Sequence, residues 1–237
     1  MRRVLFIFLL TLPLFAQDAT RPWSSTFGAG LAVTSGNTST RNVNVAATTK
    51  YDPKTRLLFK AEALYLLGRA NGEKQVDKAT ADAREEYTVS DRTFAFGEVS
   101  YLRDPFKGLA YSIAPLAGVG YRIFKSDRRT LSVDGAAGAI VENERGIGRT
   151  TSGALKAGEN FEWSLSPTSK LTEKITGIWK TKDFADALYH FDAGIATTIT
   201  TRAELKITYN YDYKNRPPAP DIKKGDSAFF AAVLFKF

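Results

Sequence analysis

The sequence has no cysteine and only one histidine among its 237 residues. Without cysteine the chain can form neither a disulfide scaffold nor a thiolate metal site, and it lacks the residue that carries the lipid of a bacterial lipoprotein. The single histidine and the interleaving of carboxylates with lysines and arginines leave no visible metal cluster. The sequence therefore predicts neither a metal nor a cofactor.

After its first residues the sequence also lacks any apolar run of about 20 residues, the length that a membrane-spanning helix needs. The first apolar run, Val4–Phe15, is too short to span a membrane and follows the basic pair Arg2 and Arg3. It ends at the small Ala16 and has no polar face, which is typical of a secretory signal peptide rather than an amphipathic first helix. We expect cleavage after Ala16.

This assignment divides the chain into a signal peptide, residues 1–16, and one domain, residues 17–237. Removing the signal lowers the formal net charge from +8 to +6, so the mature chain stays basic. A length of about 220 residues without a low-complexity linker suits a single all-β domain. Export without disulfides or lipid leaves the periplasm, the outer membrane or the medium as its location.

Apolar and polar residues alternate with a period of two along the whole mature chain. In the segment from Arg202 to Lys214, one face carries only apolar and tyrosine side chains and the other only polar ones. A helix could not separate the residues in this way. The same alternation begins near twelve positions, and an even number is usual for bacterial barrels. These positions are Trp23, Asn42, Thr55, Val76, Arg92, Leu109, Thr130, Gly148, Lys170, Ala187, Arg202 and Gly225.

The connections between these segments alternate between short turns and longer loops, as in outer-membrane barrels. With the N-terminus in the periplasm, every short turn falls on the periplasmic side, while the loop Ser35–Ser39 is an unusually short external one. The expected short turns are Asp52–Lys54, Ser90–Asp91, Lys125–Arg129, Ser166–Ser169 and Thr200–Thr201. The expected external loops are Arg69–Gln75, Asp104–Gly108, Asn143–Ile147, Lys182–Asp186 and Asn215–Lys224.

A soluble β-sandwich or a lipocalin-like barrel would show the same alternation, but its strands would be shorter. Soluble strands average five to six residues, whereas a tilted membrane strand needs roughly 9 to 11. Most of the segments exceed ten residues, and their apolar faces carry aromatic residues toward the ends and small or aliphatic residues in the middle. The sequence therefore predicts an all-β protein, a closed antiparallel transmembrane β-barrel of about twelve strands preceded by a cleaved signal peptide.

The last segment ends the chain on an aromatic residue, with apolar residues at alternate positions before it. This pattern resembles the C-terminal sorting signal of outer-membrane barrels. The alternative interpretation is a core strand that happens to end on phenylalanine. The residues assigned to the signal are Phe229, Val233, Phe235 and Phe237.

Several short motifs resemble a known family in their order and spacing. They are Thr34-Ser35-Gly36-Asn37-Thr38 after a Gly-rich strand, the run from Arg103 to Leu109, and Gly118-Val119-Gly120-Tyr121-Arg122. Together they resemble the bacterial salt-induced outer-membrane protein family (domain of unknown function 481, YdiY-like), over nearly the whole mature chain. The resemblance implies a barrel and a link to salt or osmotic stress. It implies no reaction and no catalytic residues.

Reactive chemistry has weak support in the sequence. His190 and Asp192 share a polar face and could activate a nucleophile inside the barrel, but no serine is marked as that nucleophile. Gly28-Ala29-Gly30 lacks the third glycine of a dinucleotide loop, with Val33 in its place, and no helix follows. We therefore expect no catalytic residues.

The expected partners are outer-membrane lipids, lipopolysaccharide and the barrel assembly machinery, but not nucleic acid. Basic residues in or beside the external loops suit phosphorylated lipopolysaccharide, although ordinary solubilising charge explains them equally well. Glu159 and Glu173 contradict the pattern, because they fall on the apolar face. A β-bulge is the first explanation and a protein contact the second.

Three functional classes remain, in this order: a largely closed structural or stress-related barrel, a narrow solute channel, and a lumen hydrolase using His190. The closed lumen is expected from charges of alternating sign on the polar faces. If the segments from Thr55 and Val76 pair about a turn near Glu73, Lys60 lies opposite Glu86 and Glu62 opposite Arg84. The expected lumen-facing charges are Lys60, Glu62, Arg84, Glu86, Arg202, Glu204, Lys206, Asp212 and Lys214.

Overall fold

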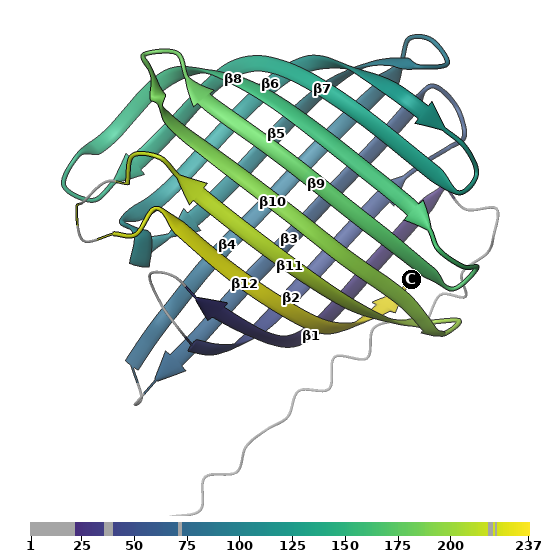
Figure 1. The fold of residues 1–237 in the computed structure, drawn as a ribbon, viewed down its shortest axis with the longest axis horizontal. Coiled ribbons are helices and arrows are strands. Elements are labelled where there is room, and N and C mark those ends of the chain that lie inside the picture. Colours follow the sequence, from purple (N-terminus) through teal and green to yellow (C-terminus); the bar gives the residue numbers. More distant parts are fainter. Residues whose placement is uncertain (1–21, 36–39, 71–72, 218–219, 221) are drawn as a thin grey trace, which may run out of the picture.

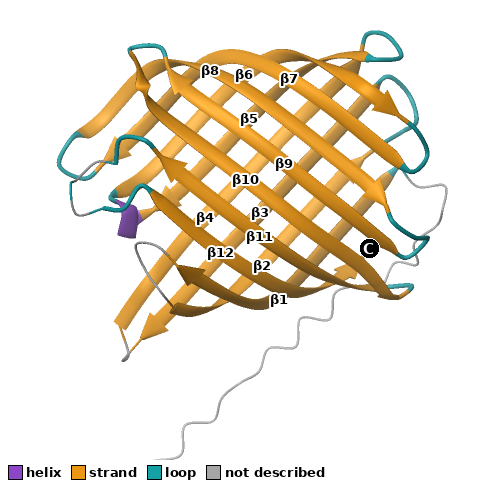
Figure 2. Cartoon of the chain, in the orientation of Figure 1, coloured by secondary structure: helices purple, strands orange, loops and turns teal. Residues whose placement is uncertain are grey.

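The computed structural model is a closed β-barrel of twelve antiparallel strands (Figures 1 and 2). It describes residues 22–35, 40–70, 73–217, 220 and 222–237, so the expected signal peptide and the tip of the first external loop lie outside the described residues. None of the helices among these residues is long and apolar enough to cross a membrane. The predicted fold class and strand number are confirmed.

Consecutive strands pair around the ring, and β1 closes it by pairing with β12. The expected starting positions agree with the observed ones within four residues. The strands are β1 (Trp23–Ser35), β2 (Thr40–Tyr51), β3 (Leu57–Ala70), β4 (Glu73–Thr88), β5 (Thr93–Asp104), β6 (Leu109–Lys125), β7 (Arg129–Glu144), β8 (Gly148–Ser164), β9 (Ser169–Lys180), β10 (Asp183–Thr200), β11 (Ala203–Lys214) and β12 (Gly225–Lys236). A short 3₁₀ helix, η1 (Pro105–Lys107), follows β5.

The side-chain period of two gives the barrel an apolar outer surface and a polar lumen. On β1, Phe27, Leu31 and Val33 are all exposed on the outside. On the lumen side of β4 and β5, Glu86 and Glu98 are buried. This is the inverse of a soluble barrel, because the large apolar side chains face outward and the charges face one another inside.

The predicted alternation of short turns with longer external loops is wrong except for the long loop between β11 and β12, and two of the predicted external loops are shortened to two residues. In place of the loop Arg69–Gln75, β3 continues to Ala70 and β4 begins at Glu73; in place of Lys182–Asp186, β10 begins at Asp183. The prediction ended a strand where its apolar alternation ended. Strand pairing continues beyond that point, because backbone hydrogen bonds do not require apolar side chains.

Aromatic side chains lie on the outer surface toward both ends of the strands. Trp23 packs against Tyr51, with 4.7 Å between the ring centroids, at the short-turn end. Trp179 packs against Tyr189 at the opposite end, where its indole nitrogen donates to the Tyr189 hydroxyl at 3.2 Å. Such aromatic belts are typical of the two membrane interfaces.

Candidate functional site in the lumen

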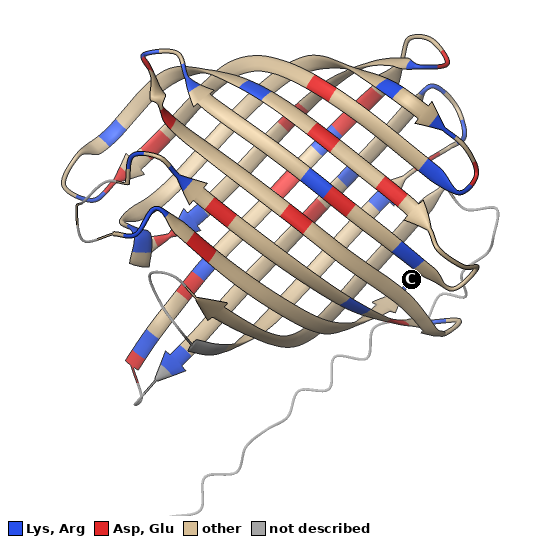
Figure 3. Cartoon of the chain, in the orientation of Figure 1, with Lys and Arg blue, Asp and Glu red and all other residues tan. Residues whose placement is uncertain are grey.

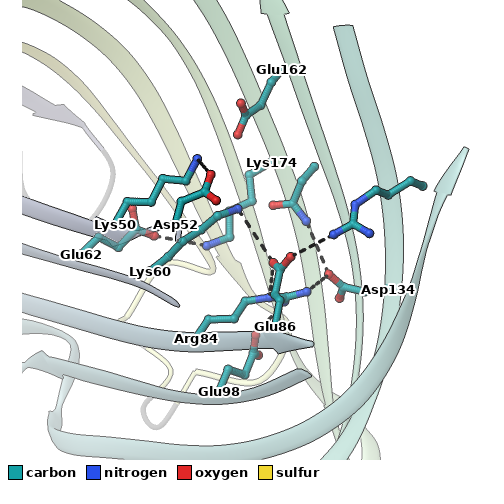
Figure 4. A network of polar contacts seen from close by, with 12 residues as sticks. Lys50, Asp52, Lys60, Glu62, Arg84, Glu86, Glu98, Asp134, Glu162 and Lys174 are labelled. Atoms are coloured by element: carbon teal, nitrogen blue, oxygen red, sulfur yellow. Dashed lines mark hydrogen bonds and ion pairs between the residues drawn. The ribbon is translucent and has the colours of Figure 1, made fainter. Parts of the chain in front are cut away.

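Arg84 on β4 is at the centre of an ion-pair network on the lumen wall between β4 and β8 (Figure 4). Its guanidinium contacts carboxylates from three strands. Nε lies 3.0 Å from Glu86, and the two terminal nitrogens lie 2.9 Å from Glu98 and from Asp134. The planar guanidinium suits this task because its donors point in several directions at once. Arg84 therefore joins β4, β5 and β7 on the inside of the barrel.

Two buried phenylalanines form the floor beneath this network. The Arg84 guanidinium lies over the Phe96 ring, 3.6 Å from its centroid, and Arg122 lies over Phe94 at 4.6 Å. Gly120 on β6 leaves the space for the Phe94 ring, since a Cβ there would come within 2.2 Å of it. The charges are thus held against aromatic faces in a largely dry environment, where cation–π attraction is strengthened.

Cations on β6 and β8 extend the network by pairing with its carboxylates. Lys156 on β8 binds Glu98, and Arg122 lies 3.6 Å from Glu86. Asn160 donates to Asp134 over 3.5 Å. With Lys60, which lies 3.8 Å from Glu86, four cations and three carboxylates are combined on this part of the lumen wall.

A second set of ion pairs crosses the lumen rather than following one wall. Glu62 on β3 and Lys174 on β9 are 3.4 Å apart, although their strands are six places apart in the ring of twelve. Lys78 on β4 pairs with Asp212 on β11 at 2.6 Å. These contacts connect opposite sides of the barrel through its interior.

Further ion pairs lie toward the end of the barrel that carries η1 and the loop after β11. Lys107 of η1 lies 2.7 Å from Asp226 on β12, and Lys214 on β11 binds Glu144 on β7. A pocket at this end is lined by both the charged side chains and aliphatic residues such as Ile140 and Ile178. The loop after β11 contributes Pro217 and Ile222 to its lining.

His190 on β10 lies between two carboxylates. Its Nε2 contacts Asp192 and its Nδ1 contacts Asp212 at 2.5 Å. Asp212 also accepts a hydrogen bond from Lys78. Both ring nitrogens are therefore engaged by acids, and neither is directed at a hydroxyl group that it could activate.

The predicted register between β3 and β4 is wrong. Lys60 lies opposite Arg84 and Glu62 opposite Asp82, so like charges are opposed in both pairs. Glu73 lies in β4 and pairs with Ala70, so it is not the centre of the turn, and moving the centre of a hairpin by one residue moves every pair by two. The opposed charges find partners elsewhere: Lys60 reaches Glu86 diagonally at 3.8 Å, and Glu62 meets Lys174 across the lumen.

The remaining predicted lumen charges occupy different surroundings. Glu204 on β11 pairs with Lys236 on β12 at 3.0 Å, while Lys206 points inward without an ion pair among the described residues. Arg202 does not belong to β11, because the strand begins at Ala203 and Arg202 lies exposed in the preceding turn. The prediction placed the strand start one residue too early.

The β-bulge proposed for Glu159 and Glu173 is also wrong. Both residues pair in regular register, Glu159 opposite Val133 and Ile175, and Glu173 opposite Phe161. Val133 and Ile175 are exposed on the outer surface, so Glu159 faces outward with them. The two carboxylates are diagonal neighbours on the lipid face, which leaves the protein contact as the explanation still to be tested.

The residues assigned to the sorting signal follow the outer face of β12. Phe229, Val233 and Phe235 are exposed there. The backbone of Phe237 exchanges two hydrogen bonds with Ser25, at 2.9 and 3.2 Å. The last residue thus takes part in closing the ring.

Three of the basic residues in or beside the external loops are already paired, and one of them is Lys74, which lies 3.3 Å from Asp77. Lys107 points to Asp226, and Arg216 binds Asp183. Lys182 donates to the backbone carbonyl of Thr151 at 2.7 Å, whereas Arg145 and Arg149 are exposed.

Several members of the lumen network were not among the predicted residues. Glu98, Asp134, Lys156 and Lys174 all occupy the polar positions of their strands. The period of two could have placed each of them inside, but it carries no information about contacts between distant strands. The signal that was overlooked is the pair Phe94 and Phe96, whose large aromatic rings alternate on a polar face.

Comparisons with known proteins agree with this architecture. The family described as protein of unknown function, DUF481, matches residues 27–237. The chain belongs to this family. The uncharacterized protein YdiY of Escherichia coli (strain K12) is 22% identical over 206 residues, covering 85% of this chain and 78% of YdiY.

Solved structures of outer-membrane barrels are similar in fold. The NanC porin covers 90% of this chain and all of its own, with a TM-score of 0.59 at 8% identity. The KdgM porin covers 90% of this chain and 99% of its own, with a TM-score of 0.52 at 7% identity. The translocator domain of the autotransporter NalP from Neisseria meningitidis covers 91% and 87%, with a TM-score of 0.50 at 12% identity. This DUF481 chain thus has an outer-membrane-type barrel that resembles porins and channels.

Proposed function

We propose that this DUF481 protein is an outer-membrane barrel whose lumen is largely closed by ion pairs, so that it has a structural or stress-related role and passes few ions. The observation that carries the proposal is the contact between Glu62 and Lys174. It joins two strands on opposite sides of the ring, at 3.4 Å. A charge pair across the interior obstructs the path that a solute would take.

The number of strands leaves this question open, and the side chains support a closed lumen. Barrels of eight strands are filled by side chains, and those of sixteen to eighteen leave an aqueous channel. Here the Arg84 network occupies one wall, and Lys78, Lys107 and Lys214 each bind a carboxylate on a distant strand. Lumen charges that neutralise one another also offer little attraction to a permeating ion of either sign.

A reaction finds little support. His190 is the only histidine, and both of its ring nitrogens are bound by carboxylates. General base catalysis needs one of these nitrogens to accept a proton from the nucleophile. A protein without enzymatic activity is therefore the simpler interpretation.

A narrow solute channel is the alternative function, favoured by the similarity of the fold to the NanC and KdgM porins. Single-channel recording of the refolded protein in planar bilayers distinguishes the two. We expect low, intermittent conductance, with a solved porin recorded in the same bilayers as the open reference. A large, stable, ion-selective conductance would contradict the closed lumen.

The link to salt stress belongs to the proposal through the family resemblance. It predicts that the amount of the protein in the cell envelope rises when the medium is made saltier. Immunodetection in outer-membrane fractions would test this, and an amount that does not change with salt would count against it.

A further inference from the structure

The rim of short turns carries most of the basic residues of its turns on one side. Three neighbouring turns, at residues 52–56, 89–92 and 125–129, contain six basic and three acidic side chains. The turn at residues 165–168 is uncharged, and the turn between β10 and β11 has Arg202 alone. We call the six basic residues the basic arc: Lys54, Arg56, Arg92, Lys125, Arg128 and Arg129.

The arc is exposed, and its three acids can balance at most half of its positive charge. All six basic residues are exposed, and the Lys54 side chain is 84% accessible. Asp52 is already shared between Lys50 and Lys54, at 3.1 and 3.0 Å. Arg92 and Arg129 form no ion pair with any described carboxylate. The arc therefore presents unneutralised positive charge around nearly half of the rim, which lies at the right of the view in Figure 3.

Two of the arginines are attached to the outer surface of the barrel rather than directed along its axis. Arg92 donates to the hydroxyl of Tyr121 over 3.4 Å, and Arg129 lies over the Trp163 ring at 5.9 Å. Tyr121 and Trp163 are themselves exposed on the outer face. The guanidinium groups are thus held at the aromatic belt, the depth at which lipid headgroups lie.

Apolar side chains extend the outer surface down to the same turns. Val89 and Leu165 lie within short turns, and Ile123 and Phe124 lie at the end of β6; each is at least 40% exposed. A small soluble anion bound to the arginines would leave these side chains in water. A membrane interface covers them with acyl chains and places the neighbouring arginines beside phosphates.

We propose that the basic arc binds the phosphate headgroups of anionic phospholipids in the leaflet on the short-turn side. This inference rests on the proposed outer-membrane location, but not on whether the lumen conducts. Arginine suits a phosphate diester because its donors bind two oxygens together, and Tyr121 and Trp163 hold two of the guanidiniums in place. The arc would enrich anionic lipid on one side of the barrel.

Trp163 provides a local reporter. In a variant with Trp23→Phe and Trp179→Phe it is the only tryptophan, since the chain has three. The protein is refolded in phosphatidylcholine vesicles that contain phosphatidylglycerol, with bromine on the acyl chains of either lipid at equal mole fraction. We expect brominated phosphatidylglycerol to quench Trp163 as though enriched about two- to fivefold, the gain expected for one basic group at an anionic surface. Equal quenching by the two lipids would overturn the proposal.

The matched controls separate the arc from general charge. Arg92→Gln with Arg129→Gln should abolish the preference, whereas Arg202→Gln on the other side of the rim should preserve it. A reporter at Trp179 alone, at the opposite end, should show no preference. Inorganic phosphate in the buffer should not displace the lipid, because it lacks the acyl chains. A preference that survives in the double arginine variant would also refute the arc, and heat-modifiable gel mobility verifies that each variant has folded.

Discussion

Glu62 and Lys174 are separated by 112 residues in the chain, and they meet inside the barrel at 3.4 Å. On its own wall Glu62 is opposite the like charge of Asp82, whereas Lys174 is opposite Asn160 and the complementary Asp192. The unfavourable pairing within the sheet is thus balanced across the lumen.

Reversing this pair should change conductance in a predictable order. Glu62→Lys places two lysines against each other, so we expect the side chains to separate and the conductance to rise. Adding Lys174→Glu restores opposite charges and should lower the conductance again. Glu204→Gln is the control, because its partner Lys236 is on the adjacent strand. If the single reversal leaves the recordings unchanged, this pair does not close the lumen.

Removing Arg84 should destabilise the barrel more than removing Lys60. Arg84→Ala leaves Glu86, Glu98 and Asp134 without their shared cation, and breaking a buried ion pair in this way costs about 3–5 kcal/mol. Lys60 is half exposed and makes one long contact, so Lys60→Ala should cost about 1 kcal/mol or less. Urea unfolding in lipid vesicles measures both. Equal midpoints for the two variants would show that the network contributes little stability.

Glu159 should be a destabilising residue when the barrel is alone in lipid. It lies midway along β8 between Trp163 and Leu155, which is opposite Trp179, and so near the middle of the apolar band. Glu159→Leu should raise the free energy of unfolding by about 1–2 kcal/mol, since carboxylates on a lipid face cost less than Lys or Arg. Glu85→Leu on β4, close to the rim, is the control and should gain less. A loss of stability on Glu159→Leu would instead support the predicted protein contact.

The turn at Asp52 should lose stability only in strong acid. Burial raises the pKa of Asp52, but hydrogen bonds from Lys54 and Lys50 outweigh it and hold the pKa at about 2, below the usual 3.8. Because the pKa is depressed in the folded state, the stabilisation is complete above about pH 4 and is lost as the pH falls toward 2. Asp52→Asn should flatten this part of the pH profile of unfolding. A profile identical in both proteins would rule out the contribution.

Changing the last residue should block assembly without blocking export. Phe237 is an exposed aromatic residue directly after β12, at the short-turn end of the barrel, and its backbone pairs with Ser25. Phe237→Asp introduces a charge at this position. We expect processed protein to accumulate outside the inner membrane but to remain extractable by urea. Phe237→Tyr serves as the conservative control. Normal heat-modifiable barrel from Phe237→Asp would show that this residue is not part of the sorting signal.

The strands could be predicted from the sequence because apolar and polar residues alternate along each one. This alternation shows which side chains face outward and which face the lumen. The alternation in β11 from Leu205 to Tyr213 is complete, and the structure confirms it. The register of β3 and β4 could not be predicted in the same way. It depended on the position of the turn to within one residue. Of the two charges chosen to decide it, Lys60 pairs diagonally with Glu86 on the same hairpin, and Glu62 pairs with Lys174 across the lumen.

The lumen network was only half predictable for a related reason. The period of two places Arg84 and Glu86 inside. It does not show that Asp134 contacts Arg84 or that Lys174 contacts Glu62, because these contacts form only when the sheet curves into a barrel. Local patterns record which face a side chain occupies. They do not record which of eleven other strands will be opposite once the sheet has closed.

The barrel can close only when β12 pairs with β1. Leu31 pairs with Ala231 and Phe27 with Phe235, so the seam joins the first described strand to the last. Contacts between such distant segments form slowly, because a long loop must first be closed. Until then the edges of both strands expose unpaired backbone that could bind another chain. Newly exported molecules must therefore be kept apart from one another until β12 reaches β1.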